Sequence, residues 1–163
     1  MGKPSLGVSI CLGDRGKSFE EAEVLFNEYR RKIAEYLEWS QEAGRIEEKR
    51  NIYVLRAGSG IDDRLIGVVA SVLLSAGMLE KEKPIVATAR SDEDLIKVSA
   101  RATEKMVEAG VDLGEAMMRA AERFSGRGGG HDTAAGAFFN EEGEEGFLEL
   151  VDEIVRRQLG SKE

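Results

Sequence analysis

One segment of the sequence carries three side chains that could bind an oxyanion. Residues 95–102 alternate in polarity, so a strand here would place Lys97, Ser99 and Arg101 on the face opposite Ile96 and Val98. An ammonium, a hydroxyl and a guanidinium in one row can donate hydrogen bonds to a phosphate. Basic side chains also occur on edge strands, where they deter aggregation. An edge-strand role therefore stands beside the phosphate-binding hypothesis.

A second segment places three glycines between a predicted helix and a predicted strand. Arg127 precedes Gly128, Gly129 and Gly130, and His131 follows them. Amides without side chains can approach a ligand closely, and the flanking arginine and histidine add donors, a combination that suits a phosphate. The run lacks the lysine and the Ser/Thr of a P-loop. A helix cap with a flexible linker and a structural histidine is the alternative interpretation.

The hydrophobic pattern predicts the elements that position these segments. Residues 51–55 and 83–89 resemble buried strands, and the helical pattern between them predicts a parallel pair with a helical crossover. We predict an α/β fold: a mixed, largely parallel sheet of about five strands with helices on both faces, preceded by a long amphipathic helix. The other predicted elements are an extended segment or strand at 5–13, helices at 18–42, 62–79, 103–109, 112–124 and 147–159, and strands at 95–102 and 134–139.

Composition excludes several classes of protein. The 163 residues suit one ordinary domain, or one domain with an arm. One histidine and one cysteine, Cys11, cannot form a Cys/His zinc cage or an intrachain disulfide, so we predict no metal site in this chain and a reduced, cytoplasmic protein. The longest apolar run, residues 65–74, is about half the ~20 residues that a membrane span needs, so no membrane partner is predicted.

The net charge of −8 excludes a broadly basic nucleic-acid-binding protein, so any polyanion site must be local. Residues 132–163 carry three basic and nine acidic residues, which accounts for −6 of the total. Residues 83–131 carry eight of each sign and are neutral. The proposed site therefore lies in the part of the chain where its basic residues are not outnumbered.

Four motifs, in this order along the chain, resemble a known family. They are the Leu-Ile-Gly-Val-Val-Ala-Ser helix at 65–71, the Lys-Pro-Ile-Val strand at 83–86, the Lys-Val-Ser-Ala-Arg strand at 97–101, and Gly-Gly-Gly-His at 128–131 followed by Ala-Ala-Gly at 134–136. Over about residues 45–140 the chain resembles the DHH-associated domain of DHH-family phosphoesterases. It is most similar to archaeal RecJ-like proteins, which are single-strand-specific nucleases.

The resemblance implies a two-domain phosphodiester hydrolase, of which this chain is the substrate-binding part. Residues 1–48 would form an extended segment and a connecting helix, and residues 49–163 the DHH-associated domain with its carboxy-terminal helix. Ser99 and Arg101 would hold a phosphate, while Gly128–Gly130 and His131 would face the scissile region. Lys97 and Arg127 are added to this binding site on geometry and charge.

Catalysis is assigned to a part of the enzyme that this chain lacks. In the family, a preceding domain with an Asp-His-His triplet holds manganese or magnesium. The triplet is absent here, and one histidine cannot build a two-metal site. We therefore predict no catalytic residue in this chain and no hydrolysis by the chain alone.

The predicted function is a single-stranded nucleic-acid-binding domain of a RecJ-like, metal-dependent exonuclease. Its expected partners are single-stranded nucleic acid, the upstream DHH domain and a replication complex such as GINS. Two alternatives stay open. The domain could serve an enzyme acting on short oligonucleotides, cyclic dinucleotides or nucleotide bisphosphates, as related domains do, or the tail of an alanyl-tRNA synthetase. It could also mediate protein contacts through its acidic carboxy-terminal helix.

Overall fold

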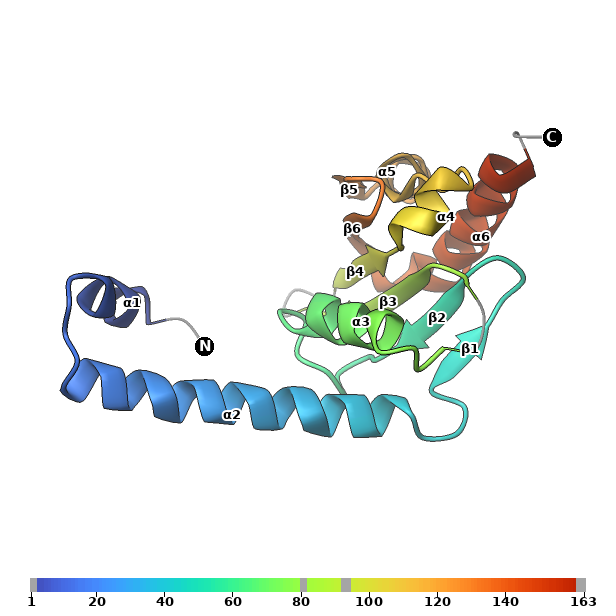
Figure 1. Cartoon of the computed structure of the whole chain (residues 1–163). Coiled ribbons are helices and arrows are strands. Elements are labelled where there is room, and N and C mark those ends of the chain that lie inside the picture. The colour runs from blue at the N-terminus through green and yellow to red at the C-terminus, as the bar shows by residue number, and fades with distance from the viewer. Residues whose placement is uncertain (1–2, 80–81, 92–94, 161–163) are drawn as a thin grey trace. The chain divides into compact units, whose positions relative to one another are not determined.

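The computed structural model describes residues 3–79, 82–91 and 95–160 (Figure 1). They divide into two compact units, one ending at Glu35 and one beginning at Tyr36. Lys17–Ser40 form helix α2, which confirms the helix predicted over residues 18–42. The boundary between the two units falls within this helix. None of the described helices is long and apolar enough to cross a membrane.

The strand or extended segment predicted over residues 5–13 is wrong. Pro4–Cys11 form helix α1. Pro4 begins this helix, where its fixed φ suits the first turn and its missing amide would have no partner in any case. The run of small and apolar residues behind it is short enough to fit either a strand or a helix, so local pattern does not decide between them.

The second unit is built on one six-stranded sheet with the strand order β1-β2-β3-β4-β6-β5. Its α/β class, its mixed sheet and the helices on both faces confirm the predicted fold class. The strands are β1 (Ile46–Glu48), β2 (Tyr53–Arg56), β3 (Ile85–Arg90), β4 (Leu95–Arg101), β5 (Arg127–Gly130) and β6 (Ala134–Asn140).

The sheet differs from the prediction in strand number and direction. It has six strands instead of about five. The predicted strand or extended segment at 5–13 is a helix, whereas β1 and the glycine-rich strand β5 were not predicted as strands. Among the strands that the structure describes, only β2 and β3 pair in parallel, with α3 (Ile66–Ser75) as the predicted crossover helix. The other four pairings are antiparallel. Short connections join three of these pairs, and such connections allow only antiparallel neighbours.

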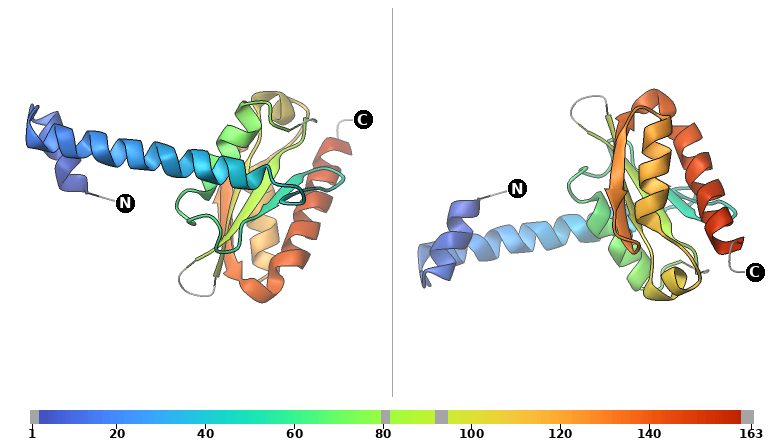
Figure 2. Two further views of the ribbon diagram at one scale, coloured as in Figure 1. Left: turned by 90° about the horizontal axis from the view of Figure 1, so that it is seen from below. Right: turned by 90° about the horizontal axis from the view of Figure 1, so that it is seen from above.

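Helices cover the two faces of the sheet unequally (Figure 2). Helices α5 (Leu113–Arg123) and α6 (Glu144–Gly160) pack on one face, where Phe139 of β6 stacks on Phe147 of α6 with ring centroids 4.3 Å apart. Ile96, Val98 and Ala100 of β4 are buried in this core. Helix α3 packs on the other face, against β3 and β4. The short helix α4 (Glu104–Glu108) follows β4.

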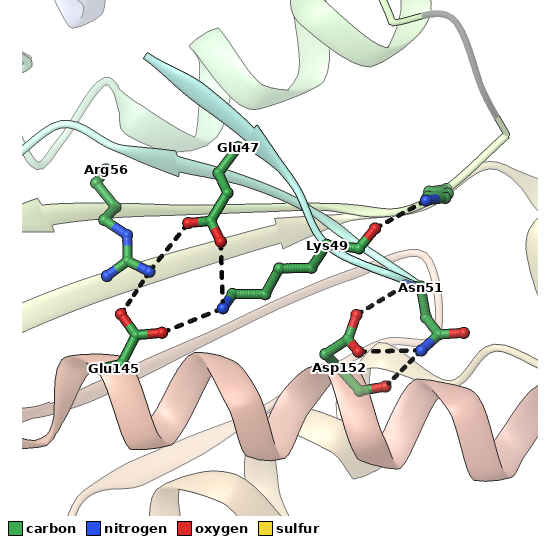
Figure 3. A network of polar contacts seen from close by, with 7 residues as sticks. Glu47, Lys49, Asn51, Arg56, Glu145 and Asp152 are labelled. Carbon is green, nitrogen blue, oxygen red and sulfur yellow. Dashed lines mark hydrogen bonds and ion pairs between the residues drawn. The ribbon is translucent and has the colours of Figure 1, made fainter. Parts of the chain in front are cut away.

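Polar contacts hold the β1–β2 hairpin against α6 (Figure 3). The Glu145 carboxylate accepts a hydrogen bond from Lys49 at 3.1 Å and pairs with Arg56 at 2.7 Å. Further along α6, Asp152 accepts hydrogen bonds from the backbone amide of Asn51 at 2.8 Å and from its side-chain amide at 3.0 Å. The hairpin is thereby fixed to the helix layer at both ends.

Candidate phosphate-binding site

A groove of about 430 Å³ between α3 and β4 brings together three of the predicted site residues, Lys97, Ser99 and Arg101. All three point to the α3 side of β4, opposite the core residues Ile96, Val98 and Ala100, as the alternating pattern predicted. The remaining lining residues come from α3 and the turn before it: Asp63, Arg64, Gly67, Val68, Ser71 and Val72.

Gly67 lets the helix approach the polar face of the strand. A β-carbon at this position would lie 2.7 Å from Nη2 of Arg101 and 3.2 Å from Oγ of Ser99. Any side chain would therefore push the guanidinium out of its place. Ser71, one turn later, faces the same groove. Neither residue was predicted to belong to the site, although two small residues spaced i, i+4 in an otherwise bulky apolar helix are a signal of close approach.

Arg101 is half-buried at the floor of this groove. Its Nε donates to the Ser71 hydroxyl at 3.0 Å and its Nη1 to the carbonyl of Ala100 at 2.8 Å. Within the described ranges, no carboxylate pairs with it. Burial lowers the pKa of the guanidinium below its ordinary value, yet an arginine stays charged at neutral pH. A desolvated cation without a counterion favours binding of an anion.

Asp63 places a negative charge at the rim of the same groove. Its carboxylate lies 4.0 Å from the Lys97 ammonium, and both side chains are largely shielded from solvent. The ion pair holds Lys97 near the groove and partly cancels its charge. Ser99, only 7% exposed, lies between Lys97 and Arg101 along the strand. Lys97 is therefore partly neutralised, whereas Arg101 has no ion pair among the described residues.

The glycine run, for which the sequence suggested a phosphate-binding segment or a helix cap with a flexible linker, forms the edge strand β5. Gly128 faces α5, where a β-carbon would lie 2.2 Å from the carbonyl oxygen of Met117. Gly130 has a φ of +144° and would meet the carbonyl of Ala134. These two glycines are explained by packing and backbone conformation. Gly129, with a φ of +153°, borders open space, so its backbone is accessible to a ligand.

Arg127 and His131 line other hollows than the groove. His131 is exposed and borders a hollow of about 570 Å³ together with Gly129, Gly130 and acidic residues at the start of α5. Arg127 is exposed and borders another, of about 550 Å³, together with Phe138. The structure therefore gathers three predicted site residues in one groove and spreads the other five along β5 and its turn. A ligand-binding role for all eight stays a prediction.

The described residues contain no cluster of three or more His, Cys, Asp or Glu side chains that could hold a metal ion. The only histidine in the sequence, His131, has acidic neighbours Asp112, Glu115 and Asp132 around its hollow, but they do not form such a cluster. The expectation that manganese or magnesium is bound by a separate catalytic domain stays a prediction.

The fold and the groove define an α/β domain whose half-buried arginine, unpaired among the described residues, lines an open groove. Residues 50–157 match the sequence model of the DHHA1 domain, so the chain belongs to the DHHA1 family of DHH-associated domains. This confirms the resemblance seen in the sequence motifs. The match begins at the hairpin before β2 and ends in the last turn of α6.

A longer relative and two solved structures are similar to this chain. The uncharacterized protein MJ0831 of Methanocaldococcus jannaschii is 32% identical over 155 residues, which cover 95% of this chain and 32% of that protein. The chain thus spans about a third of its relative's length.

The solved structures show the same fold at lower identity. RecJ of Thermus thermophilus in complex with Mg²⁺ is 24% identical with a TM-score of 0.65, covering 86% of this chain and 20% of that chain. The C-Ala domain of Aquifex aeolicus alanyl-tRNA synthetase is 15% identical with a TM-score of 0.54, covering 68% of this chain and 96% of that domain.

Proposed function

We propose that this chain is the substrate-binding domain of a RecJ-like phosphoesterase and that its groove holds a phosphate of single-stranded nucleic acid. Family membership and the RecJ-like fold support the assignment to a DHH phosphoesterase. Hydrolysis is left to a separate DHH domain with manganese or magnesium. In this proposal the chain binds and orients the strand, and the partner domain cleaves it.

The observation that carries the proposal is how the guanidinium of Arg101 is held in the groove. Its Nε and Nη1 are held by Ser71 and by the carbonyl of Ala100, which fixes the plane of the guanidinium. Its Nη2 lies beside Gly67, whose β-carbon position also adjoins the Ser99 hydroxyl, and Arg101 lines the groove. A phosphate oxygen placed there would accept charge-assisted hydrogen bonds from a donor whose position is already set, at little cost in side-chain entropy.

The salt dependence of binding tests this assignment. We expect Arg101→Gln to weaken binding of a fluorescent single-stranded twenty-mer and to lower the slope of log affinity against log salt by about 0.7, the value for one lost phosphate contact on a single strand. Fluorescence anisotropy between low and moderate salt measures both quantities. Circular dichroism checks that the variant is folded.

Arg123→Gln is the matched control, because Arg123 is an exposed arginine of α5 on the opposite face of the sheet. The two variants change the net charge equally. Equal affinities and equal slopes for both variants would show that the groove does not hold a phosphate, and that the basic residues of β4 have only a structural role.

The same assay decides between long and short substrates. The groove is open along the sheet, and the exposed residues Arg127 and His131 lie beyond it on β5 and its turn, which favours a strand that continues past one phosphate. A twenty-mer is then expected to bind more tightly than a dinucleotide. Docking on a replication complex such as GINS has less support, because Glu145 and Glu153 of the acidic helix α6 are paired within this chain.

A further inference from the structure

An exposed aromatic ring lies on the face of the sheet that α3 leaves open. Helix α3 packs on β3 and β4, and the same face continues onto β6 and β5. Phe138 of β6 points to this face and is 44% exposed, whereas its strand neighbours Ala137 and Phe139 point into the core and are 1% and 2% exposed. Single exposed apolar residues are common on protein surfaces, so exposure alone indicates nothing.

Two cations flank this ring across the sheet. Lys97 of β4 and Arg127 of β5 are the residues directly opposite Phe138 on its two neighbouring strands. The Lys97 ammonium lies 5.8 Å from the ring centroid. Arg127 is exposed and, as far as the described residues extend, forms no ion pair. An aromatic face between two cations is the arrangement that proteins use to stack a nucleobase while attracting its backbone.

No side chain separates the ring from the groove on these two strands. The next row of the sheet on the same face joins Ser99 to Gly136 and Gly129, so β6 and β5 present only backbone there. Rows on one face lie about 7 Å apart along a strand. One nucleotide can therefore reach from a phosphate at Ser99 to a base at Phe138, across a surface that neither strand obstructs.

We propose that Phe138 is a stacking platform for one nucleobase of the bound single strand. This inference rests on the proposed function, and it adds that the domain recognises the strand by base as well as by phosphate. Stacking on a phenyl ring tolerates every base and both sugars. The platform therefore contributes affinity for single strands without selecting a sequence.

Oligonucleotides with and without bases separate stacking from phosphate binding. The probes are a fluorescent twelve-mer of thymidine and a twelve-mer of the same backbone with abasic sites, measured by anisotropy on the full chain. We expect the chain to bind the thymidine strand more tightly. Phe138→Ala should lower that affinity about fivefold or more, a typical loss for one stacked base, and should leave the abasic affinity and the salt slope unchanged. Phe138→Trp should retain the preference for bases.

Two controls keep the outcomes distinct. Phe26→Ala removes an exposed ring of α2 and should change neither affinity, while Arg101→Gln should weaken both strands alike. Stacking is overturned if the wild-type chain binds thymidine and abasic strands with equal affinity and Phe138→Ala binds both with that same affinity. Phosphate binding stands in that case. If the wild-type chain shows no salt-dependent binding to either strand, the proposed function fails and stacking with it.

Discussion

Charges of both signs line the groove, and their balance sets how strongly the groove attracts an anion. Arg101 at the floor has no acidic partner within the described residues, whereas Lys97 at the rim lies 4.0 Å from Asp63. Near a protein surface, two unit charges at this separation interact by a few kcal/mol at most, and salt reduces that further. Asp63 therefore weakens the groove in two ways, by occupying Lys97 and by repelling an approaching phosphate.

Asp63→Asn should consequently raise the affinity for single-stranded oligonucleotides about two- to fivefold, the range of one exposed ion pair. Its salt slope should steepen by up to about 0.7, because Lys97 becomes available for a phosphate. Anisotropy titrations in a salt series measure both. Glu122→Gln on α5 makes the same change in net charge away from the groove, so an equal gain in that variant would reduce the effect to net charge alone.

At the scale of residues, sequence revealed the strand side of the groove, three of its nine lining residues. The alternation of polar and apolar residues along 95–102 was enough to place Lys97, Ser99 and Arg101 on one face, because successive side chains of a strand point to opposite faces. Gly67 and Phe138 escaped notice for a physical reason. Their roles depend on which face of α3 meets β4 and on how far α3 extends across the sheet, and neither is encoded in local periodicity.

At the scale of elements, packing and backbone conformation account for two of the three glycines in the run. The run suggested a phosphate-binding segment, and that role stays a prediction. Gly128 is required by the approach of β5 to the Met117 carbonyl, and Gly130 by its positive φ. Sheet direction was misjudged because most neighbouring strands are not joined by helical crossovers. The β2–α3–β3 unit with its paired parallel strands was found correctly, but hairpins join three of the other four pairs, and all four are antiparallel.

The contacts of Glu145 tie two elements together in a way that depends on pH (Figure 3). Hydrogen bonds from Lys49 and from Arg56 hold the pKa of Glu145 below its ordinary value of 4.5, and the same two cations also pair with Glu47. A carboxyl whose pKa is lowered by folding contributes stability above its unfolded pKa. That contribution is lost as the pH falls from about 4.5 through the folded pKa.

Glu145→Gln should therefore lower the free energy of unfolding by about 0.5–1 kcal/mol at pH 7, a size limited by the exposure of these pairs. The difference from the wild type should shrink steadily below pH 4.5. Urea denaturation at a series of pH values measures it. Glu149→Gln, an exposed position one turn along α6, should show no such convergence. A constant difference at all pH values would mean that the carboxylate charge is not what holds the hairpin.

At the scale of the whole molecule, a binding surface and a cleavage centre occupy different parts of a larger enzyme in the proposed function. The relative from Methanocaldococcus jannaschii is about three times as long as this chain, which leaves room for a catalytic domain. The DHHA1 domain supplies a groove with a fixed arginine and an open sheet face. Such a division lets the binding surface set which strands are held while the metal site stays the same.

This division predicts binding without cleavage. In the presence of manganese, the 163-residue chain should bind a labelled single-stranded twenty-mer and leave that strand intact. The physical reason is that two-metal hydrolysis needs several carboxylate and imidazole ligands around the scissile phosphate, and the sequence has one histidine. Gel analysis of the products over time measures cleavage. A parallel sample of His131→Ala identifies a copurified nuclease, whose activity would persist in it. Robust cleavage by the chain that disappears in His131→Ala would place a catalytic centre here and contradict the binding-domain assignment.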